Sequence, residues 1–187
     1  MDLPCRRFGR TNINMPVLSL GGMRFQKSWD DLKFSEISQK EQKKVENILN
    51  LANKLGFNHI ETAKYYGTSE VQLGMGFKST NKIPSIIQTK IPPNRDPKLF
   101  ELELLKSFEK LKVNKIDLLS IHGINSPEHL HQAVRDGGCI NILKKFQKEK
   151  LIGYIGFSTH GESSLIEKAI STNCFDYVNL HWYYINQ

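Results

Sequence analysis

The stretches PSIIQTK, residues 84–90, and KIDLLSIH, residues 115–122, decide the fold class of this chain. Each is a short, nearly continuous apolar run that ends in a polar or charged side chain. Strands that are covered on both faces have this pattern, because neither of their faces meets water. Two further runs of the same kind, YIGF (154–157) and YVNL (177–180), follow later in the chain. The sequence therefore predicts a buried parallel sheet.

Helical segments separate the predicted strands. In one of them, apolar residues line a single helical face, and Gly56 follows where a helix C-cap glycine is common. In another, Asp96 and Pro97 have the residue types favoured at the N-cap and at the first helical position. The expected face of the first helix consists of Val45, Ile48, Leu49, Ala52 and Leu55. The expected strands are 17–20, 57–60, 85–89, 116–121, 153–157 and 175–180, and the other expected helices are 69–75, a segment starting at Ser126-Pro127, 140–150 and 162–170.

This alternation of strands and helices predicts parallel pairing through right-handed crossovers. No GxGxxG sequence follows the first expected strand, and there is no Walker A sequence. We therefore expect a single domain over residues 1–187 with an α/β fold of the (β/α)8 TIM-barrel type. Complete barrels have eight strands and typically ~250 residues. With about six parallel strands and flanking helices, this chain is expected to be an incomplete barrel, truncated on its C-terminal side.

The bulk composition is that of an ordinary globular protein. No apolar run reaches the ~18 residues of a membrane span, and the opening MDLPCRRFGRTN lacks the apolar segment of a secretory signal. A cytoplasmic location is therefore expected. The net charge of +7 comes from helical stretches with interleaved acids and accompanies no nucleic-acid-binding motif. The scattered cysteines Cys5, Cys139 and Cys174 predict neither a disulfide framework nor a metal site.

Polar side chains stand at the ends of the predicted strands. In a parallel barrel the C-terminal ends of the strands converge on one mouth, where active sites are built. A single such residue carries little information, but successive strands that each supply one polar group predict a site at this mouth. The residues are Arg24 after the first strand, Glu61 and Tyr66 after the second, Lys90 and His122 ending the third and fourth, Ser158 and Thr159 after the fifth, and Asn179 in the sixth.

Three of these segments, HIETAKYYGTSE (59–70), QTK (88–90) and DLLSIH (117–122), resemble the catalytic segments of the aldo-keto reductase family in order and spacing. The opening RRFGRTNINMPVLSLGGMRF (6–25) resembles the bottom hairpin and first barrel strand of that family. The stretches LIGYIGFST (151–159) and FDYVNLHWYY (175–184) resemble its fifth and sixth strands. The resemblance thus extends over nearly the whole chain.

The resemblance implies reduction of a small-molecule carbonyl substrate, an aldehyde or ketone, by NAD(P)H. Tyr66 would be the general acid, and Lys90 would lower the pKa of its phenol, because a nearby cation favours the phenolate. His122 would orient the carbonyl oxygen, and Glu61 would pair with Lys90, although the family normally has the shorter Asp at this position. Tyr65 is a second phenol beside Tyr66, and the sequence leaves it open as an alternative donor.

The resemblance also implies the cofactor contacts. Gly22, Met23 and Arg24 would lie along the cofactor, with Arg24 near its phosphates. The nicotinamide carboxamide would bind Ser158, Thr159 (where the family commonly has Asn) and Asn179 (where it commonly has Gln). The basic balance and the habit of the family favour NADPH, with NADH as the other candidate. No metal is expected.

Several residues keep two interpretations. Ser158 and Thr159 could instead cap the following helix. Phe25 and Trp29 could line a substrate pocket or anchor a loop. The aromatic residues after the sixth strand, Trp182, Tyr183 and Tyr184, could stack near the nicotinamide or pack under further helices.

Three functions remain open for the chain as a whole. The first is the carbonyl reductase, and the second is a non-catalytic truncated barrel that acts as a binding or regulatory subunit. The third is a barrel enzyme that uses Lys90 as a Schiff-base nucleophile. In an open six-strand sheet the edges at 17–20 and 175–180 would be exposed, so self-association or a partner chain that covers them is also expected.

Overall fold

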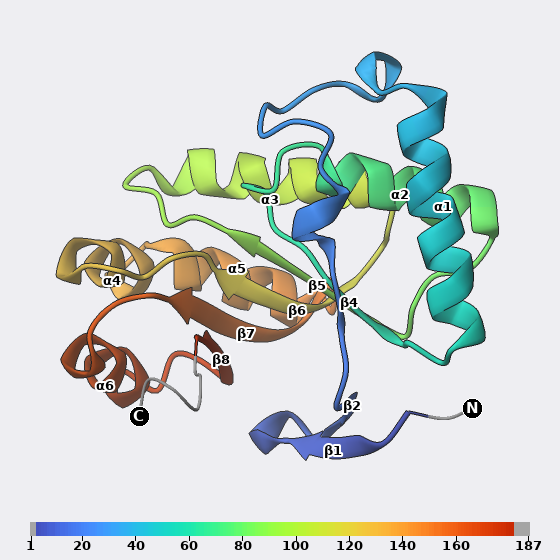
Figure 1. Cartoon of the computed structure of the whole chain (residues 1–187). Coiled ribbons are helices and arrows are strands. Elements are labelled where there is room, and N and C mark those ends of the chain that lie inside the picture. Colours follow the sequence, from blue (N-terminus) through green and yellow to red (C-terminus); the bar gives the residue numbers. More distant parts are fainter. Residues whose placement is uncertain (1–2, 182–187) are drawn as a thin grey trace.

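A computed structural model describes residues 3–181 of the chain. Six parallel strands form one sheet in chain order, and the sheet curls into part of a barrel (Figure 1). The strands are β3 (Leu20–Gly21), β4 (His59–Glu61), β5 (Ile86–Ile91), β6 (Ile116–Ile121), β7 (Ile152–Thr159) and β8 (Tyr177–Leu180). The prediction of an incomplete (β/α) barrel with six parallel strands is thereby confirmed.

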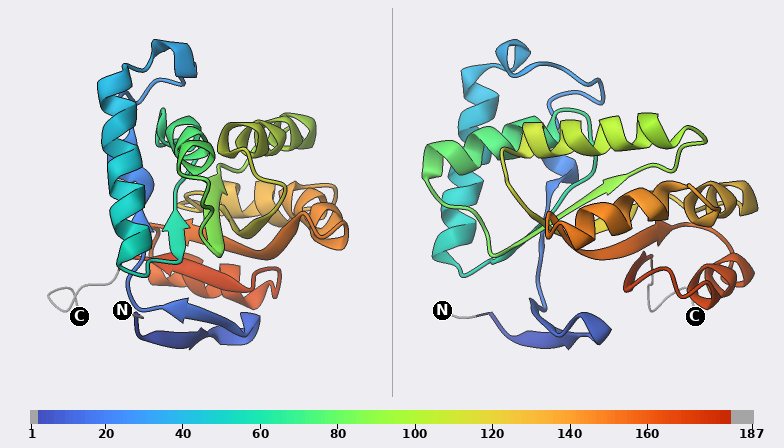
Figure 2. Two further views of the ribbon diagram at one scale, coloured as in Figure 1. Left: turned by 90° about the vertical axis from the view of Figure 1, so that its right-hand side faces the viewer. Right: turned by 180° about the vertical axis from the view of Figure 1, so that it is seen from behind.

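Helices cover the outer side of the curled sheet (Figure 2). They are α1 (Gln39–Lys54), α2 (Ser69–Thr80), α3 (Pro97–Leu111), α4 (Pro127–Val134), α5 (Cys139–Lys148) and α6 (Ser163–Ser171). The Asp96 side chain accepts a hydrogen bond from Lys98 N at 2.8 Å, and Ser126 Oγ accepts one from His129 N at 3.2 Å. The Asp96 and Ser126 side chains therefore cap the N-termini of their helices, as predicted. None of the helices between residues 3 and 181 is long and apolar enough to cross a bilayer.

The larger hydrophobic core lies between the sheet and the helices. Phe100 and Leu104 of α3 are fully buried there, together with Leu119 and Ile121 of β6 and Phe157 of β7. Alternate residues of a strand point to opposite faces of the sheet, and these strand residues point away from the barrel axis and toward the helices. This core fixes the strands and hence the position of their C-terminal ends.

A smaller core fills the bottom of the barrel. An antiparallel hairpin, β1 (Cys5–Phe8) and β2 (Ile13–Pro16), lies across this end of the sheet (Figure 1). Its side chains Phe8, Ile13 and Met15 pack against Ile86, Leu118, Tyr154 and Tyr177, which come from four strands. The hydroxyl of Tyr154 also donates to Thr11 O between the two strands of the hairpin. The hairpin implied by the family resemblance is thus present, and it closes the end of the barrel opposite the predicted site.

Two local predictions were wrong. The expected strand 17–20 is reduced to two residues, because Val17 N donates to Pro4 O at 2.9 Å and so extends the hairpin instead of the sheet. Val17 and Leu18 are accordingly 50% and 54% exposed. Ile48 of α1 and Leu55, which caps its C-terminal end, are exposed rather than buried.

The buried face of α1 is completed by a polar residue. Gln42 lies on this face one turn before Val45, where the expected apolar face began, and its Nε2 donates to Gln72 O at 3.2 Å. Because Gln72 belongs to α2, this hydrogen bond joins the two helices on the side where Gln42, Val45, Leu49 and Ala52 face inward.

Candidate active site

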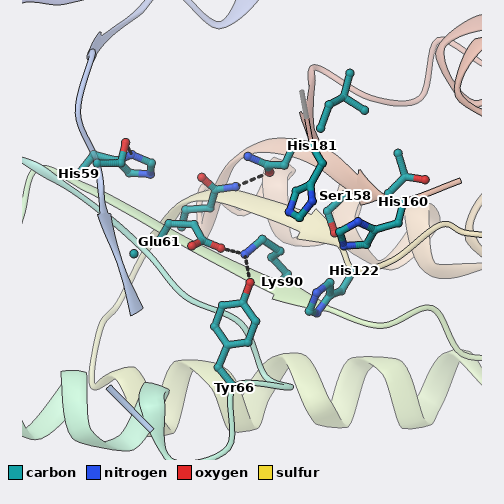
Figure 3. A pocket seen from close by; sticks show the side chains of 14 residues that line it. His59, Glu61, Tyr66, Lys90, His122, Ser158, His160 and His181 are labelled. Atoms are coloured by element: carbon teal, nitrogen blue, oxygen red, sulfur yellow. Dashed lines mark hydrogen bonds and ion pairs between the residues drawn. The ribbon is translucent and has the colours of Figure 1, made fainter. Parts of the chain in front are cut away.

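A cavity of about 320 Å³ opens at the C-terminal ends of the strands (Figure 3). It includes seven of the predicted site residues: Glu61, Tyr66, Lys90, His122, Ser158, Thr159 and Asn179. Its other lining residues are Ser19, Gly21, His59, Gln88, His160, Leu180 and His181. Residues that are far apart in the sequence are therefore brought together at the barrel mouth, as the strand-end pattern predicted.

Lys90 of β5 is the centre of the predicted tetrad. Its side chain is buried, and its Nζ donates to Tyr66 Oη at 3.2 Å and to Thr62 O at 3.1 Å. The same ammonium forms an ion pair with Glu61 (Figure 3). The extra methylene of Glu61 relative to Asp therefore does not prevent the pairing that was expected of this position.

Burial dominates the electrostatics of Lys90 and Tyr66. It lowers the pKa of the Lys90 ammonium to about 7, while contact with the Glu61 carboxylate acts in the opposite direction. Burial also raises the pKa of the Tyr66 phenol above its ordinary value. The sequence analysis expected Lys90 to lower the Tyr66 pKa. This expectation was wrong, because the phenol loses contact with water and its pKa rises. Burial therefore favours the protonated form of Tyr66 further.

His122 lies beside Tyr66 in the cavity. Their rings meet edge to face, with centroids 5.9 Å apart. Burial lowers the pKa of His122 to about 4, and the positive charge of Lys90 acts in the same direction. The imidazole is therefore neutral at physiological pH. Its Nδ1 is buried without a hydrogen-bond partner among residues 3–181.

The two adjacent tyrosines occupy different places. Tyr66 reaches Lys90, whereas Tyr65 is 57% exposed and does not line this cavity. The turn that follows them explains the orientation of Tyr66. Gly67 has a φ of +52°, and a Cβ there would lie 1.8 Å from Ser28 O. Only glycine allows the loop after β3 to pack this closely on the segment that carries Tyr66.

Ser158 and Thr159 are the last two residues of β7. Ser158 Oγ accepts a hydrogen bond from Gly123 N at 3.0 Å, and Thr159 Oγ1 donates to Ile124 O at 2.6 Å. They do not cap α6, whose N-cap residue is Glu162. Their hydroxyls instead tie β7 to the loop that follows β6, which excludes the capping interpretation.

Asn179 of β8 lies across the cavity from β5. Its Oδ1 accepts hydrogen bonds from Gln88 Nε2 at 2.7 Å and from Ser120 Oγ at 3.2 Å. Ser120 Oγ in turn lies 3.0 Å from Tyr177 Oη. The floor of the cavity is therefore a polar network that joins β5, β6 and β8 and fixes the orientation of the Asn179 amide.

The remaining predicted cofactor residues lie outside the cavity lining. Gly22, Met23 and Arg24 form a short 3-10 helix with Phe25 directly after β3. At Gly22 a Cβ would lie 2.9 Å from both Glu61 O and Ser69 Oγ, so a side chain there would separate β3 from its neighbours. Met23 and Arg24 are exposed at the same end of the barrel as the cavity.

The aromatic residues that the sequence left with two interpretations differ in their burial. Phe25 is buried in the core and anchors its loop, whereas Trp29 is 63% exposed and lines neither this cavity nor the core. Trp182, Tyr183 and Tyr184 lie outside the described residues.

The sequence analysis did not identify several polar residues of the cavity. His59 and Gln88 each stand two positions before a predicted site residue, and His160 and His181 stand two positions after one. Alternate residues of a strand point to the same face, so a period of two was the signal that could have found them. Their chemical types alone gave no such indication.

The family model described as the aldo/keto reductase family matches residues 17–185. The chain therefore belongs to the aldo/keto reductase family. No curated protein sequence matches the chain at a significant level.

Solved structures show the same fold. A putative aldo-keto reductase from Pseudomonas aeruginosa is 19% identical, with a TM-score of 0.69 over 96% of this chain and 79% of that one. The holo form of an aldo-keto reductase from Bacillus halodurans is 17% identical, with a TM-score of 0.76 over 96% of this chain and 58% of that one. A Bombyx mori aldo-keto reductase in complex with NADP is 20% identical, with a TM-score of 0.69 over 97% of this chain and 59% of that one. The chain thus spans between 58% and 79% of the length of these proteins.

Proposed function

We propose that this chain is an oxidoreductase that reduces an aldehyde or ketone to an alcohol by hydride transfer from a nicotinamide cofactor. The observation that carries the proposal is the position of Lys90 Nζ, which contacts the Glu61 carboxylate and lies 3.2 Å from Tyr66 Oη in a cavity at the barrel mouth. A phenol, an ammonium and a carboxylate in this order form a proton-donating unit. The bound cofactor would supply the hydride.

Tyr66 acts as the general acid. Negative charge builds on the carbonyl oxygen as its carbon is reduced, and the Tyr66 hydroxyl donates a proton to that oxygen to complete the alcohol. The phenolate that remains is stabilised by the Lys90 ammonium beside it. Glu61 keeps this ammonium in place and favours its charged form, which burial alone would disfavour. The site is ready again when the phenolate regains a proton from solvent.

His122 positions the substrate. As a neutral imidazole it can donate one hydrogen bond to the carbonyl oxygen without adding a positive charge to the site. Its edge-to-face contact with Tyr66 places the two donors on one side of the cavity. Together they define where the carbonyl oxygen binds.

The cavity wall opposite this pair fits the nicotinamide carboxamide. Because Asn179 Oδ1 accepts two hydrogen bonds within the protein, its Nδ2 is left to donate to a carbonyl oxygen. Ser158 would bind the same group, and Thr159 supports it through the loop after β6. We propose Gly22, Met23 and Arg24 as contacts for the rest of the cofactor. NADPH is favoured over NADH by the net charge of +7 and by the NADP in the Bombyx mori relative.

The replacement of Tyr66 by Phe tests the proposal. Removal of the proton donor should lower kcat by about 10²–10⁴-fold, the range for loss of general acid catalysis, while cofactor binding is unchanged. The measurement is the oxidation of NADPH at its absorbance maximum with a panel of aldehydes. Tyr65→Phe is the matched control and should stay within about three-fold of the wild type, since it keeps the ring and removes only the hydroxyl of a residue that does not line the active-site cavity. Equal activity of wild type and Tyr66→Phe would refute the role of Tyr66.

Two other outcomes identify the alternative functions. Cofactor binding in a fluorescence titration without turnover of any carbonyl would favour the binding or regulatory subunit. Borohydride trapping of a carbonyl compound on Lys90 would favour the Schiff-base enzyme, for which a lysine pKa of about 7 is suitable. The contacts of the Lys90 ammonium with Thr62 O, Tyr66 and Glu61 favour the reductase, because they stabilise the charged form, which is not nucleophilic.

A further inference from the structure

An apolar stripe runs along the outer side of α3. This helix packs between α2 and α5 on the outside of the curled sheet (Figure 2). Leu99, Leu102 and Leu105 follow one another at intervals of three residues, and they are 49%, 46% and 50% exposed. Residues at this spacing are neighbours on a helix surface. Single exposed leucines are ordinary, but three adjacent ones on one helix indicate an interaction surface.

The ion pairs of α3 leave two of its charged residues without a partner. Four charged side chains of the helix form ion pairs within the protein, which are Glu101–Lys145, Glu103–Lys64, Glu103–Lys106 and Lys110–Asp31. Lys98 and Glu109 are exposed, and their side chains form no ion pair or hydrogen bond among residues 3–181. Lys98 stands one turn before Leu102. Glu109 stands one turn after Leu105, so the two unpaired charges flank the stripe.

Neither unpaired charge stabilises α3 itself. A helix favours negative charge at its N-terminus and positive charge at its C-terminus, because unsatisfied N–H and C=O groups are exposed at these ends. Lys98 is the second residue of α3 and Glu109 is the third from its end, so each lies near the end that disfavours its sign. A partner that supplies both opposite charges would account for this placement.

A second copy of the same helix supplies these charges when it packs antiparallel. In a twofold-symmetric contact, residue i meets residue j of the partner, and j meets i. With the axis between Leu102 and Leu105, Leu102 meets Leu105 of the second copy. Lys98 then meets Glu109 of the second copy, because both lie one turn outside the leucine pair. The contact therefore has leucine layers at its centre and an ion pair at each end, as in a short antiparallel coiled coil.

Other arrangements of the two helices lose this match. In a parallel pair, Lys98 would face Lys98 and Glu109 would face Glu109 of the second copy, and the like charges would repel. An antiparallel pair centred on Leu102 would bring Lys98 opposite Lys106 of the second copy. The pattern of α3 thus favours one register, and it favours a copy of the same helix as the partner.

This surface is separate from the active site and from the open edges of the sheet. β5, which leads into α3, lies between β4 and β6, while the edge strands are β3 and β8. None of the residues of the stripe lines the active-site cavity. A single helix from each copy gives less than the roughly 800 Å² per partner of a stable interface, so the association should be weak and reversed by dilution.

We propose that the chain forms a weak twofold dimer through α3, with Leu102 and Leu105 at its centre and Lys98–Glu109 ion pairs at both ends. The dimer goes beyond the proposed function and does not depend on it. Its formation can therefore be tested without a substrate or a cofactor.

Sedimentation equilibrium from low-micromolar to sub-millimolar concentration tests for the dimer. The wild type should change from monomer to dimer over this range. Leu102→Gln should raise the dissociation constant at least about ten-fold, because each dimer loses two apolar contacts. Leu51→Gln, the same change at a 56% exposed leucine of α1, is the matched control and should dimerise as the wild type does.

Two results of this experiment would overturn the proposal. A wild type that stays monomeric over the whole range would leave the stripe to a different partner. A dimer that Leu102→Gln does not weaken would be formed through another surface, such as the sheet edges.

Charge reversal tests the register. Lys98→Glu and Glu109→Lys each place like charges at both ends of the homodimer, so each variant alone should dimerise about ten-fold more weakly than the wild type. An equimolar mixture of the two variants should recover the affinity of the wild type, because opposite charges then meet at both ends. Recovery also shows that both variants are folded. A mixture that associates no more tightly than either variant alone would overturn the antiparallel contact.

Discussion

The two faces of the sheet differ in chemistry although the same strands form both. On β6 and the residue after it, Leu119 and Ile121 point outward into the larger core, while Leu118, Ser120 and His122 point toward the barrel interior. The outer face is mainly apolar, although Thr89 of β5 donates there to Glu70 of α2. The inner face changes from apolar at the hairpin to polar in the middle and titratable at the mouth.

This difference separates stability from activity. Outward residues bury apolar surface against helices and give the fold its free energy of unfolding. Inward polar residues lose contact with water, which is costly unless a hydrogen-bond partner lies on another strand. Gln88, Ser120 and Asn179 satisfy one another in this way. Mutations on the two faces should therefore differ in kind as well as in size.

The largest effect is expected from the outer core. Phe100 of α3 is fully buried, and Phe100→Ala should lower the free energy of unfolding by about 3–5 kcal/mol, because it leaves a cavity under the helix. Urea unfolding followed by circular dichroism measures the loss. Leu102→Ala on the same helix is the control, since Leu102 is 46% exposed and its truncation should cost no more than about 1 kcal/mol. Equal losses would show that the outer face is not the main source of stability.

An intermediate effect is expected from His59 in acid. Burial lowers its pKa from 6.5 to about 4, and the charge of Lys90 acts in the same direction. Between these values the unfolded chain binds a proton that the folded chain does not, so stability falls as the pH drops from 6.5 to about 4. His59→Gln should remove roughly 2 kcal/mol of this decrease, measured by urea unfolding over that pH range.

His122 has a pKa displaced in the same direction, so some acid sensitivity should remain in His59→Gln. His131→Gln, on the exposed side of α4, is the matched control and should leave the pH profile of the wild type unchanged. A His59→Gln profile identical to that of the wild type would contradict the buried, neutral state of His59.

The smallest effect on stability is expected from the polar floor of the cavity. Gln88→Leu keeps the volume but removes the donor to Asn179, and it should cost about 1 kcal/mol of stability, the value of one hydrogen bond. If the proposed function holds, it should also raise KM for NADPH, because the Asn179 amide loses its fixed orientation. Gln147→Leu removes a comparable hydrogen bond, to Gly153 O at 2.8 Å on the helical side, and should affect stability alone. A change in KM for NADPH in both variants would show that the inner and outer faces of the sheet do not differ in their effect on cofactor binding.

Much of the fold could be predicted from the sequence, because most strands contain apolar runs that are long enough to be recognised. The five expected strands after the first, and the helix starts at Asp96 and Ser126, are present with small shifts of their ends. The first strand was misplaced because Val17 and Leu18 are apolar but pair with the hairpin and not with the sheet. Composition does not indicate which partner a short apolar segment will have.

Some residues of the candidate site could also be predicted from the sequence, and others could not. Spacing in the sequence placed Glu61, Tyr66, Lys90 and His122 at strand ends, and the parallel register brought them to one cavity. It did not reveal His59 or Gln88, because single polar residues in strands are ordinary until the closure of the sheet encloses them.

By itself, the sequence determined the order of elements, the family and the residues at the ends of the strands, since these depend on local pattern and spacing. Only the tertiary structure decided their protonation. It raised the pKa of Tyr66 and lowered that of Lys90 to about 7, in each case because the curled sheet removes the group from water. Desolvation depends on every segment that surrounds a side chain, and no spacing along the chain contains that information.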